Sequence, residues 1–280
     1  MDAPDAAVVA AQVAAALAED LGAGDLTAGL LPANLSARAR LLVREDAVLC
    51  GSAWFEAAFR QLDAQAGIDW YAGDGDRLVP DQTVCRITGR ARALLSAERT
   101  ALNFLQTLSG TATAAARYVA AIEGTGAVVL DTRKTLPGLR LAQKYAVRCG
   151  GADNHRVGLY DAVLIKENHI RAAGSIAAAL DAARAVADRA DFVEIEVEDL
   201  DGLEQALASG ATRILLDNFS LAGLREAVRR NAGRARLEAS GGVSLATVRD
   251  IAATGVDYVS VGQLTKDLRA TDYSLQFEVD

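Results

Sequence analysis

Hydrophobic and polar positions follow one regular pattern after about residue 126. Short apolar runs, typical of buried strands, alternate there with segments of helical period, and strand and helix recur about every 20–35 residues. The predicted strands are residues 128–130, 162–165, 192–197, 213–216, 236–239 and 258–261. The predicted helices are residues 139–148, 175–187, 200–208, 221–230 and 244–253. This alternation indicates parallel βαβ units, and six strands are too few for a closed (β/α)₈ barrel, so we expect an incomplete barrel.

The first part of the chain has a mixed pattern that predicts an α+β fold. Residues 6–19 form an alanine-rich helical pattern, and an aromatic stripe at helical spacing begins at Trp54. Strands are predicted at residues 37–43, 69–71, 76–78 and 84–92. Ser96 is predicted to cap a helix that runs to Leu108, with a break at Ser109-Gly110 and a second helix over 113–122. We therefore expect an N-terminal α+β sandwich domain.

The C-terminal tail, residues 271–280, alternates like a strand and has no helix after it. We expect this tail to return to the first domain and to complete it by pairing there. The predicted division is an N-terminal domain of residues 1–112 joined by 266–280, and an incomplete α/β barrel of residues 113–265 that holds the catalytic site.

Composition limits the classes of partner. The 280 residues carry a net charge of -8, which disfavours non-specific binding to nucleic acid or to an anionic membrane. The first residues have no basic signal-peptide region, and no apolar run approaches a membrane span, so we expect a cytoplasmic protein. Cys50, Cys85 and Cys149 show no ligand spacing, so we expect buried thiols in a reducing compartment instead of a disulfide framework or a zinc site.

Positive charge is focused between Asp131 and Arg171. Both histidines of the chain, His155 and His169, lie in this segment, together with three of its four lysines. A focused basic segment in an acidic protein indicates a pocket for a polyanionic small molecule. Asn154-His155-Arg156, in a loop after two glycines, favours a functional role for His155, whereas we expect a structural role for His169.

Polar groups follow each predicted strand of the barrel, where such folds place their active sites. The strand ends are Asp131-Thr132-Arg133-Lys134, Lys166-Glu167-Asn168, Glu194 to Glu198, Asp217-Asn218, Glu238 to Gly242, and Ser260 to Gln263. The cations among them suit carboxylates or phosphates. The strand ends together predict the rim of one site with cations on one side and carboxylates on the other.

The carboxylates and glycines of this rim suggest a phosphorylated sugar. Glu196 and Asp217 end neighbouring strands and could hold Mg²⁺, directly or indirectly, or accept from ribose hydroxyls, while Glu194 or Glu196 could instead pair with a neighbouring cation. Glycine turns at the last two strands offer backbone N–H groups to a phosphate. Their residues are Ser240, Gly241 and Gly242, then Val261, Gly262 and Gln263. The residues alone thus predict an enzyme for a phosphorylated sugar, with Mg²⁺ and a small anionic co-substrate.

The chain closely resembles the quinolinate phosphoribosyltransferase family over nearly its whole length. The motifs that carry the resemblance are E-D-L-G-A-G-D-L-T at 19–27, E-R-T-A-L-N-F-L-Q-T-L-S-G-T-A-T at 98–113, D-T-R-K-T-L-P-G-L-R at 131–140, K-Y-A-V-R-C-G-G-A-D-N-H-R-V-G-L at 144–159, L-I-K-E-N-H-I at 164–170, E-I-E-V-E at 194–198, L-L-D-N-F at 215–219 and E-A-S-G-G-V at 238–243. The resemblance implies conversion of quinolinate and phosphoribosyl pyrophosphate to nicotinate mononucleotide, pyrophosphate and CO₂, with Mg²⁺, in NAD biosynthesis.

The resemblance also implies a homodimer or a higher homo-oligomer, in which Arg99 reaches the substrate of the partner subunit. It implies that quinolinate is held by Arg133, Lys134, His155 and Arg156, next to Thr132. It places Lys166 near the pyrophosphate, and Glu196 and Asp217 at the ribose or the metal, with catalytic roles for Lys134, Lys166, Glu196 and Asp217. The resemblance assigns the 5′-phosphate to the loops Ser240 to Gly242 and Val261 to Gln263. Gln263 and Lys266 depart from the family, which more often has alanine and histidine there.

Three other interpretations compete with this one. A ModD-like paralogue of molybdenum transport operons is disfavoured by the cations Arg133, Lys134 and Arg156 beside His155. A Schiff-base aldolase would use Lys166 as nucleophile and would need that lysine to be desolvated. A phosphosugar-binding regulator would need a site that binds without turnover.

Overall fold

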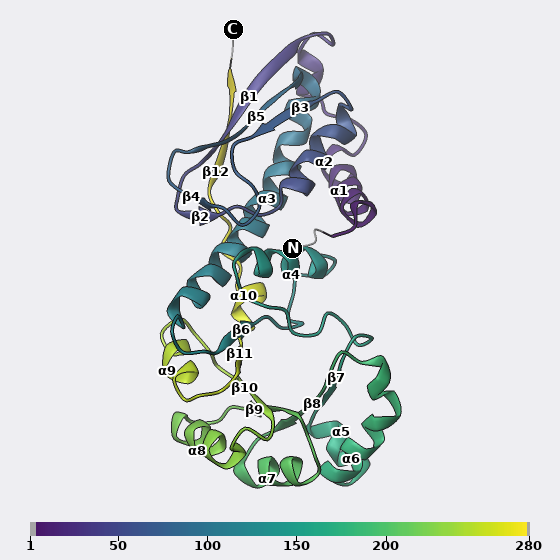
Figure 1. Cartoon of the computed structure of the whole chain (residues 1–280). Helices are drawn as coiled ribbons and strands as arrows, with labels where there is room; N and C mark the ends of the chain where they lie inside the picture. Colours follow the sequence, from purple (N-terminus) through teal and green to yellow (C-terminus); the bar gives the residue numbers. More distant parts are fainter. Residues whose placement is uncertain (1–3, 279–280) are drawn as a thin grey trace. The chain divides into compact units, whose positions relative to one another are not determined.

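The computed structural model describes residues 4–278, and the chain separates into two compact units (Figure 1). Unit 1 takes residues up to Ala116, Leu136–Gly151 and the chain from Leu268 onward. Unit 2 takes Arg117–Thr135 and Ala152–Asp267. No helix among residues 4–278 is both long enough and apolar enough to cross a membrane.

Unit 1 contains an antiparallel sheet in the order β12-β1-β5-β3. Its strands are β1 (Ser36–Val43), β3 (Gly67–Trp70), β5 (Thr83–Arg90) and β12 (Tyr273–Glu278), and a small second sheet joins β2 (Ala47–Val48) to β4 (Arg77–Leu78). Leu41 of β1 lies opposite Leu275 of β12 on one side and Cys85 of β5 on the other. The predicted return of the C-terminal tail to the first domain is therefore confirmed, with residues 279–280 of that prediction outside the described residues.

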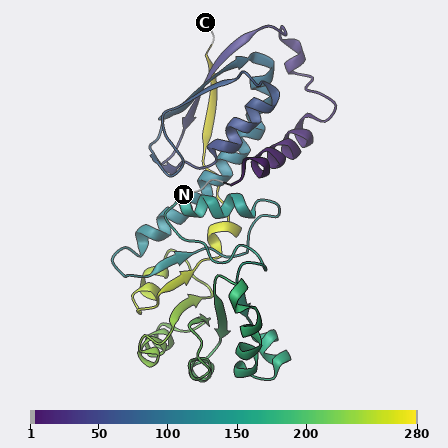
Figure 2. The same ribbon diagram turned by 45° about the vertical axis from the view of Figure 1, so that its right-hand side comes forward.

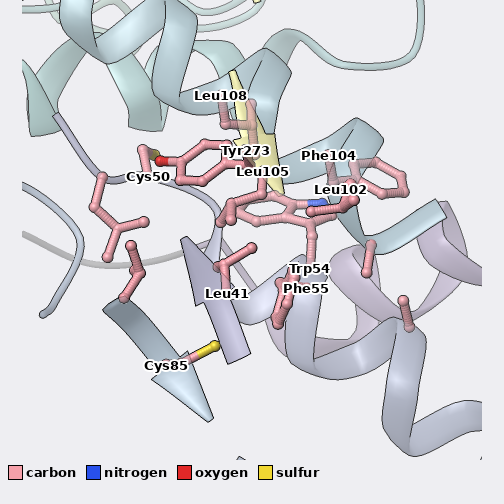
Figure 3. Packing of buried hydrophobic residues seen from close by; sticks show 14 of the residues in the cluster. Leu41, Cys50, Trp54, Phe55, Cys85, Leu102, Phe104, Leu105, Leu108 and Tyr273 are labelled. Carbon is pink, nitrogen blue, oxygen red and sulfur yellow. The ribbon is translucent and has the colours of Figure 1, made fainter. Parts of the chain in front are cut away.

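Helices cover this sheet and share its core. They are α1 (Ala6–Leu21), the 3₁₀ turn η1 (Ala28–Leu30), α2 (Ser52–Leu62), the first part of α3 (Ala91–Ala121) and α4 (Arg140–Cys149). Asp5 accepts a hydrogen bond from the Ala7 N–H and caps α1. The predicted aromatic stripe lies in α2, where Trp54, Phe55 and Phe59 are buried. Figure 3 shows Trp54 against Leu105 of α3, so this stripe is core.

Two sequence predictions about α3 are wrong, because this helix runs without a break for 31 residues. Ser96 lies inside α3 instead of capping it, and its Oγ donates a 2.7 Å hydrogen bond to Asp25 Oδ2. Ser109-Gly110 does not interrupt the helix. A Cβ on Gly110 would lie 2.2 Å from the carbonyl oxygen of Arg269, so glycine serves here for the close approach of another segment.

Segment Leu136–Gly151 belongs to unit 1, whereas the predicted division assigned it to the barrel domain. Ala142, Ala146 and Cys149 of α4 are buried in the same hydrophobic core as α2 and α3. A strand followed by an amphipathic helix looks alike in sequence whichever core the helix joins. The segment therefore leaves the barrel after β6 (Val128–Leu130) and returns to it after Gly151.

Unit 2 is a six-stranded parallel sheet in the order β6-β11-β10-β9-β8-β7. The remaining strands are β7 (Val163–Ile165), β8 (Val193–Val197), β9 (Arg213–Asp217), β10 (Arg236–Ser240) and β11 (Tyr258–Ser260). Within residues 4–278, β6 and β7 each have only one neighbouring strand, so the sheet does not close. The prediction of an incomplete α/β barrel beside an α+β domain is confirmed.

The helices of unit 2 follow the strands in turn. They are α5 (Glu167–Ala173), α6 (Ile176–Ala183), the 3₁₀ segment η2 (Arg184–Arg189), α7 (Leu200–Ala208), α8 (Leu221–Asn231), α9 (Val248–Ala252) and α10 (Gln263–Lys266). Figure 1 and Figure 2 show α6 to α9 on the outer side of the curved sheet. The predicted helix 175–187 ends earlier, at Ala183, and the predicted helix 244–253 begins only at Val248. Helix α5 was not predicted.

Candidate active site

The inner side of strands β8, β9 and β10 carries two levels of polar residues. Glu194, Arg213 and Glu238 form the deeper level, and Glu194 and Glu238 are fully buried. Glu196 and Asp217 lie farther along β8 and β9, at their C-terminal ends. Because side chains of a strand alternate between its faces, residues two or four positions apart share the inner face. The sequence thus places a buried level under an open rim.

The deeper level is held together by Arg213. Its Nε donates to Glu194 Oε1 at 3.0 Å, and its Nη2 donates to Glu238 Oε2 at 2.8 Å. The guanidinium also stacks between Phe192, at 4.1 Å from the ring centroid, and Tyr258, at 4.6 Å. The planar fork of arginine suits two carboxylates at once, so this buried charge is well fixed.

His155 joins this level, which we call the inner cluster (His155, Glu194, Arg213 and Glu238). Its Nε2 lies 2.8 Å from Glu194 Oε2, and its Nδ1 accepts a 2.7 Å hydrogen bond from the Arg156 N–H. With Nδ1 as the acceptor, the proton of the ring lies on Nε2, which donates to Glu194. The fully buried Asp131 accepts from the His155 N–H at 2.9 Å and fixes the loop.

Below about pH 7 the inner cluster holds a proton on one of its carboxyl groups. Burial, and then the charge of Glu194, raises the pKa of Glu238 to about 7. Burial also raises the pKa of Glu194, while Arg213 opposes that shift. Glu238 Oε1 accepts no hydrogen bond from residues 4–278, and once protonated it becomes a donor to Glu194. In that state Arg213 pairs with one carboxylate and one protonated carboxyl group.

Arg133 and Arg156 form a cationic pair beside the inner cluster. Burial, and then the charge of Arg133, lowers the pKa of Arg156. Arg133 Nε is buried and has no hydrogen-bond partner among residues 4–278. A buried donor without an acceptor costs free energy unless a ligand supplies one. Two neighbouring guanidinium groups with an open donor are therefore suited to an anion.

The open rim mixes lysines with carboxylates. Lys166 Nζ forms an ion pair with Glu196 Oε2. Burial, and then the charge of Glu196, raises the pKa of Asp217, while Lys166 and Lys134 lower it. The sequence left open whether Glu194 or Glu196 pairs with a cation, and in the structure both do, Glu194 with Arg213 and Glu196 with Lys166.

The contacts of Lys166 and His169 bear on the roles predicted for these two residues. The Lys166 side chain is 48% exposed and ion-paired, which weighs against an aldolase that would need it desolvated. His169 Nδ1 accepts a 2.9 Å hydrogen bond from the Lys166 N–H at the start of α5. This contact agrees with the structural role expected for His169.

The two glycine loops lie close to other predicted site residues. Gly241 has φ 101°, and a Cβ there would meet Asn218 Oδ1 at 2.1 Å, so only glycine fits beside Asn218. A Cβ on Gly262 would lie 3.3 Å from Lys134 Cδ and 3.7 Å from Thr132 Oγ1. Gly262 is the N-cap residue of the single-turn helix α10, whereas α9 begins only at Val248, six residues after Gly242.

The remaining predicted residues lie as follows. Val261 is buried, and Ser240 lies opposite Asp217 in the register of β10 and β9. Gln263 accepts a 2.7 Å hydrogen bond from the Tyr118 hydroxyl. Arg99 is exposed on the part of α3 that belongs to unit 1. The structure therefore brings together the predicted residues of the barrel within unit 2, and Arg99 belongs to unit 1.

Sequence reasoning missed the role of Arg213 and the position of Tyr118. Arg213 begins a strand, where an arginine is usually a solvated charge. A signal was present in Glu194 and Glu238, which occupy otherwise apolar strands and need a buried cation.

Two family models match the chain consecutively. The "Quinolinate phosphoribosyl transferase, N-terminal domain" matches residues 25–109, and the "Quinolinate phosphoribosyl transferase, C-terminal domain" matches residues 111–276. The chain belongs to the quinolinate phosphoribosyltransferase family. A nicotinate-nucleotide pyrophosphorylase [carboxylating] of Mycobacterium leprae is 44% identical over 93% of this chain and 94% of its own length. The probable enzyme of that name from Bacillus subtilis is 38% identical, over 92% and 89%.

Solved structures of the quinolinate phosphoribosyltransferase family agree with the fold. The nicotinate-nucleotide pyrophosphorylase from Francisella tularensis superposes with a TM-score of 0.93 at 43% identity, covering 98% of this chain and 97% of the other. NadC from Streptococcus pyogenes gives a TM-score of 0.94 at 40% identity and covers both chains fully.

Proposed function

We propose that this quinolinate phosphoribosyltransferase, an enzyme of NAD biosynthesis, joins quinolinate to phosphoribosyl pyrophosphate at the rim of unit 2. The products are nicotinate mononucleotide, pyrophosphate and CO₂. Family membership supports the reaction class, and the roles of individual residues follow from their chemistry.

The cationic pair of Arg133 and Arg156 is the observation that carries the proposal. Quinolinate presents two adjacent carboxylates, and guanidinium groups bind carboxylates through paired hydrogen bonds. The buried Arg133 Nε has no acceptor in the described part of the chain, and the two guanidinium groups repel each other, so a dianion relieves both costs. His155 positions this pair, because its ring nitrogens are occupied by Glu194 and by the Arg156 N–H.

Phosphoribosyl transfer requires opposite charges at one carbon. As the bond from C1 of the ribose to pyrophosphate breaks, positive charge develops on the sugar and negative charge on the leaving group. We assign Glu196 and Asp217 to the ribosyl cation, and Lys134 and Lys166 to the pyrophosphate. The quinolinate nitrogen then forms the new bond to C1 with its lone pair.

Decarboxylation follows from that new bond. The ring nitrogen is now positively charged, so it accepts electron density from the neighbouring carbon when the bond to CO₂ breaks. A proton from water takes the place of the lost carboxylate. The 5′-phosphate is assigned to the loops at Ser240 to Gly242 and Val261 to Gln263, where a Cβ on Gly241 or Gly262 would lie close to neighbouring side chains.

Mg²⁺ is proposed as the cofactor, held by Glu196 and Asp217. The Glu196 charge contributes to the raised pKa of Asp217, and a divalent cation would favour the ionised form of both carboxylates. Carboxylate oxygens are the donors that Mg²⁺ prefers in proteins. When bound, the ion would neutralise charge on the diphosphate of the substrate.

A homodimer or higher homo-oligomer is proposed, with Arg99 completing the site of the partner subunit. Arg99 is exposed. The hydrogen bond from Ser96 to Asp25 anchors the segment around Leu26 to α3, and Leu26 and Leu30 are exposed on this segment. Large exposed apolar residues next to a cation suit a surface that a second copy covers. A cytoplasmic location is also proposed, supported by three cysteines that are thiols.

The reaction is tested with purified protein, phosphoribosyl pyrophosphate, Mg²⁺ and either quinolinate or nicotinate. We expect product and CO₂ from quinolinate only. The R156M variant should lose at least about a hundredfold in kcat/KM for quinolinate, because a carboxylate of the substrate loses its guanidinium partner. The control variant R171M, on the exposed face of α5, should keep full activity. Equal turnover of nicotinate would contradict the proposed role of the cationic pair.

The partner role of Arg99 is tested by mixing two inactive variants, R99A and K166A. If Arg99 acts across subunits, mixed dimers contain one intact site, and activity should return to about a quarter of the wild-type value after subunit exchange. No recovery in mixtures that native mass spectrometry shows to contain mixed dimers would contradict this role.

A further inference from the structure

Unit 1 brings together two cysteines that lie far apart in the sequence. The Sγ atoms of Cys50 and Cys149 and a carboxylate oxygen of Asp74 all lie within 4.8 Å of one another. Cys50 precedes α2 and Cys149 ends α4, and both are buried. The third cysteine, Cys85 on β5, lies well apart from Cys50 in Figure 3. The sequence predicted three separate thiols, so this pair is a structural finding.

The two thiols differ in their tendency to ionise. The Cys50 thiol donates a hydrogen bond to the Cys149 sulfur. This hydrogen bond is the largest cause of the lowered pKa of Cys149. Burial raises the pKa of Cys50 well above its usual value. Cys149 is therefore the better nucleophile, and Cys50 keeps its proton beside it.

The backbone on both sides of the pair is held in place. Asp74 accepts hydrogen bonds from the Gly51 and Ser52 N–H groups, each at 3.2 Å, and from the Tyr145 hydroxyl at 3.0 Å. The Cys50 N–H donates to Ser109 Oγ at 3.0 Å. These contacts tie the start of α2 to α4, so the two sulfurs meet in the folded protein without a large rearrangement.

We propose that Cys50 and Cys149 are a peroxide-sensitive pair that closes to a reversible intramolecular disulfide. The Cys149 thiolate attacks one oxygen of hydrogen peroxide, the O–O bond breaks, and the departing hydroxide takes a proton to leave as water. The Cys50 sulfur then attacks the sulfenic acid of Cys149 and displaces a second water. Two thiols and one peroxide give one disulfide and two waters, and a dithiol reductant reverses the reaction.

The same three groups could instead be ligands for a thiolate-binding metal, but the observations favour the disulfide. A metal would need both sulfurs as thiolates, and Cys50 lies in a site that strongly disfavours its charged form. Asp74 already accepts three hydrogen bonds. Disulfide formation needs only one thiolate at a time, which Cys149 supplies.

The experiment treats the full chain with hydrogen peroxide, blocks remaining thiols, and maps the peptides by mass spectrometry without reduction. We expect a mass loss of two hydrogens and a peptide that joins Cys50 to Cys149, removed by dithiothreitol. The matched control C85S should form the same cross-link, whereas C50S and C149S should not, with circular dichroism verifying that each variant is folded.

Three results would overturn the proposal. One is oxidation of Cys149 to sulfinic acid without a cross-link in the wild type and in C85S. Another is a cross-link between two copies of the chain. The third is stoichiometric zinc in the purified protein that protects both thiols, which would assign the pair to a metal.

Discussion

Glu238 determines how the inner cluster responds to pH. Burial and the charge of Glu194 raise the pKa of Glu238 from 4.5 to about 7. The folded state thus holds this proton more tightly than the unfolded state. Its contribution to stability is complete below about pH 4.5 and is lost as the pH rises through about 7.

The variant E238Q cannot ionise and should remove this pH dependence. In the wild type, ionisation of Glu238 should lower the free energy of unfolding by on the order of 2–3 kcal/mol between about pH 5 and about pH 8. Urea unfolding across that range measures the difference between the two proteins. The control variant E204Q, at a half-exposed glutamate, should follow the wild type. A slope in E238Q equal to that of the wild type would refute the assignment.

Gly241 should be more sensitive to substitution than Gly242. Both have positive φ, but a Cβ at Gly241 would meet Asn218 Oδ1 at 2.1 Å, whereas a Cβ at Gly242 has nothing within 4 Å. G241A should therefore displace Asn218 and its neighbour Asp217, and lower kcat/KM for phosphoribosyl pyrophosphate by at least about tenfold more than G242A. Steady-state kinetics test this pair, and equal losses would show that only backbone strain matters.

At this scale, the sequence predicted which residues gather but not how deep each lies. The rim cations and carboxylates could be found because each follows a predicted strand. Two things could not be read from order along the chain. They were the burial of His155 against Glu194, and the choice of Arg213 as the inner cation. Both depend on which strands become neighbours in the sheet.

Helix α3 illustrates how tertiary contact overrides a local signal. Ser109-Gly110 is typical of a helix break, yet α3 continues because Gly110 makes room for the segment that leads to β12. Helix α5 escaped prediction because Lys166 occupies its N-cap position, where Ser, Thr, Asp or Asn would give a signal. The six strands of unit 2 were predicted to within one residue at each end, whereas β2 of unit 1 was not predicted.

Substitution of Gly110 tests this explanation of α3. Alanine normally stabilises a helix interior by about 1 kcal/mol relative to glycine. G110A should instead destabilise the protein by roughly 1–3 kcal/mol, because its Cβ would overlap the Arg269 carbonyl oxygen. Urea unfolding provides the measurement. G29A, whose Cβ meets nothing within 4 Å, is the control and should change stability little.

The C-terminal strand matters for the whole of unit 1. β12 covers one edge of β1 over six residue pairs, and Tyr273 donates a 2.9 Å hydrogen bond to the buried Ser109. Deletion of residues 272–280 should expose that edge and remove Tyr273 from the core, so the protein should unfold at lower temperature and aggregate. Thermal unfolding with light scattering tests this, and deletion of residues 279–280 alone should have little effect.

The domain division was the least predictable property of the molecule. Segment Leu136–Gly151 follows a barrel strand and carries site motifs on both sides, so its sequence position suggests the barrel. Its small apolar residues Ala142 and Ala146 instead pack into the core of unit 1. Small side chains fit many cores equally well, and only the folded arrangement determines which core they join.

The pairing of β1 with β12 also imposes an order on biosynthesis. Roughly 230 residues separate Val43 from its partner Tyr273, and ribosomes add about 5–20 residues per second. The edge of β1 therefore waits about 10–50 seconds for its partner after leaving the ribosome. The domain that is translated first is completed among the last. During that interval the edge of β1 is not paired with β12 and is open to binding by a cellular chaperone.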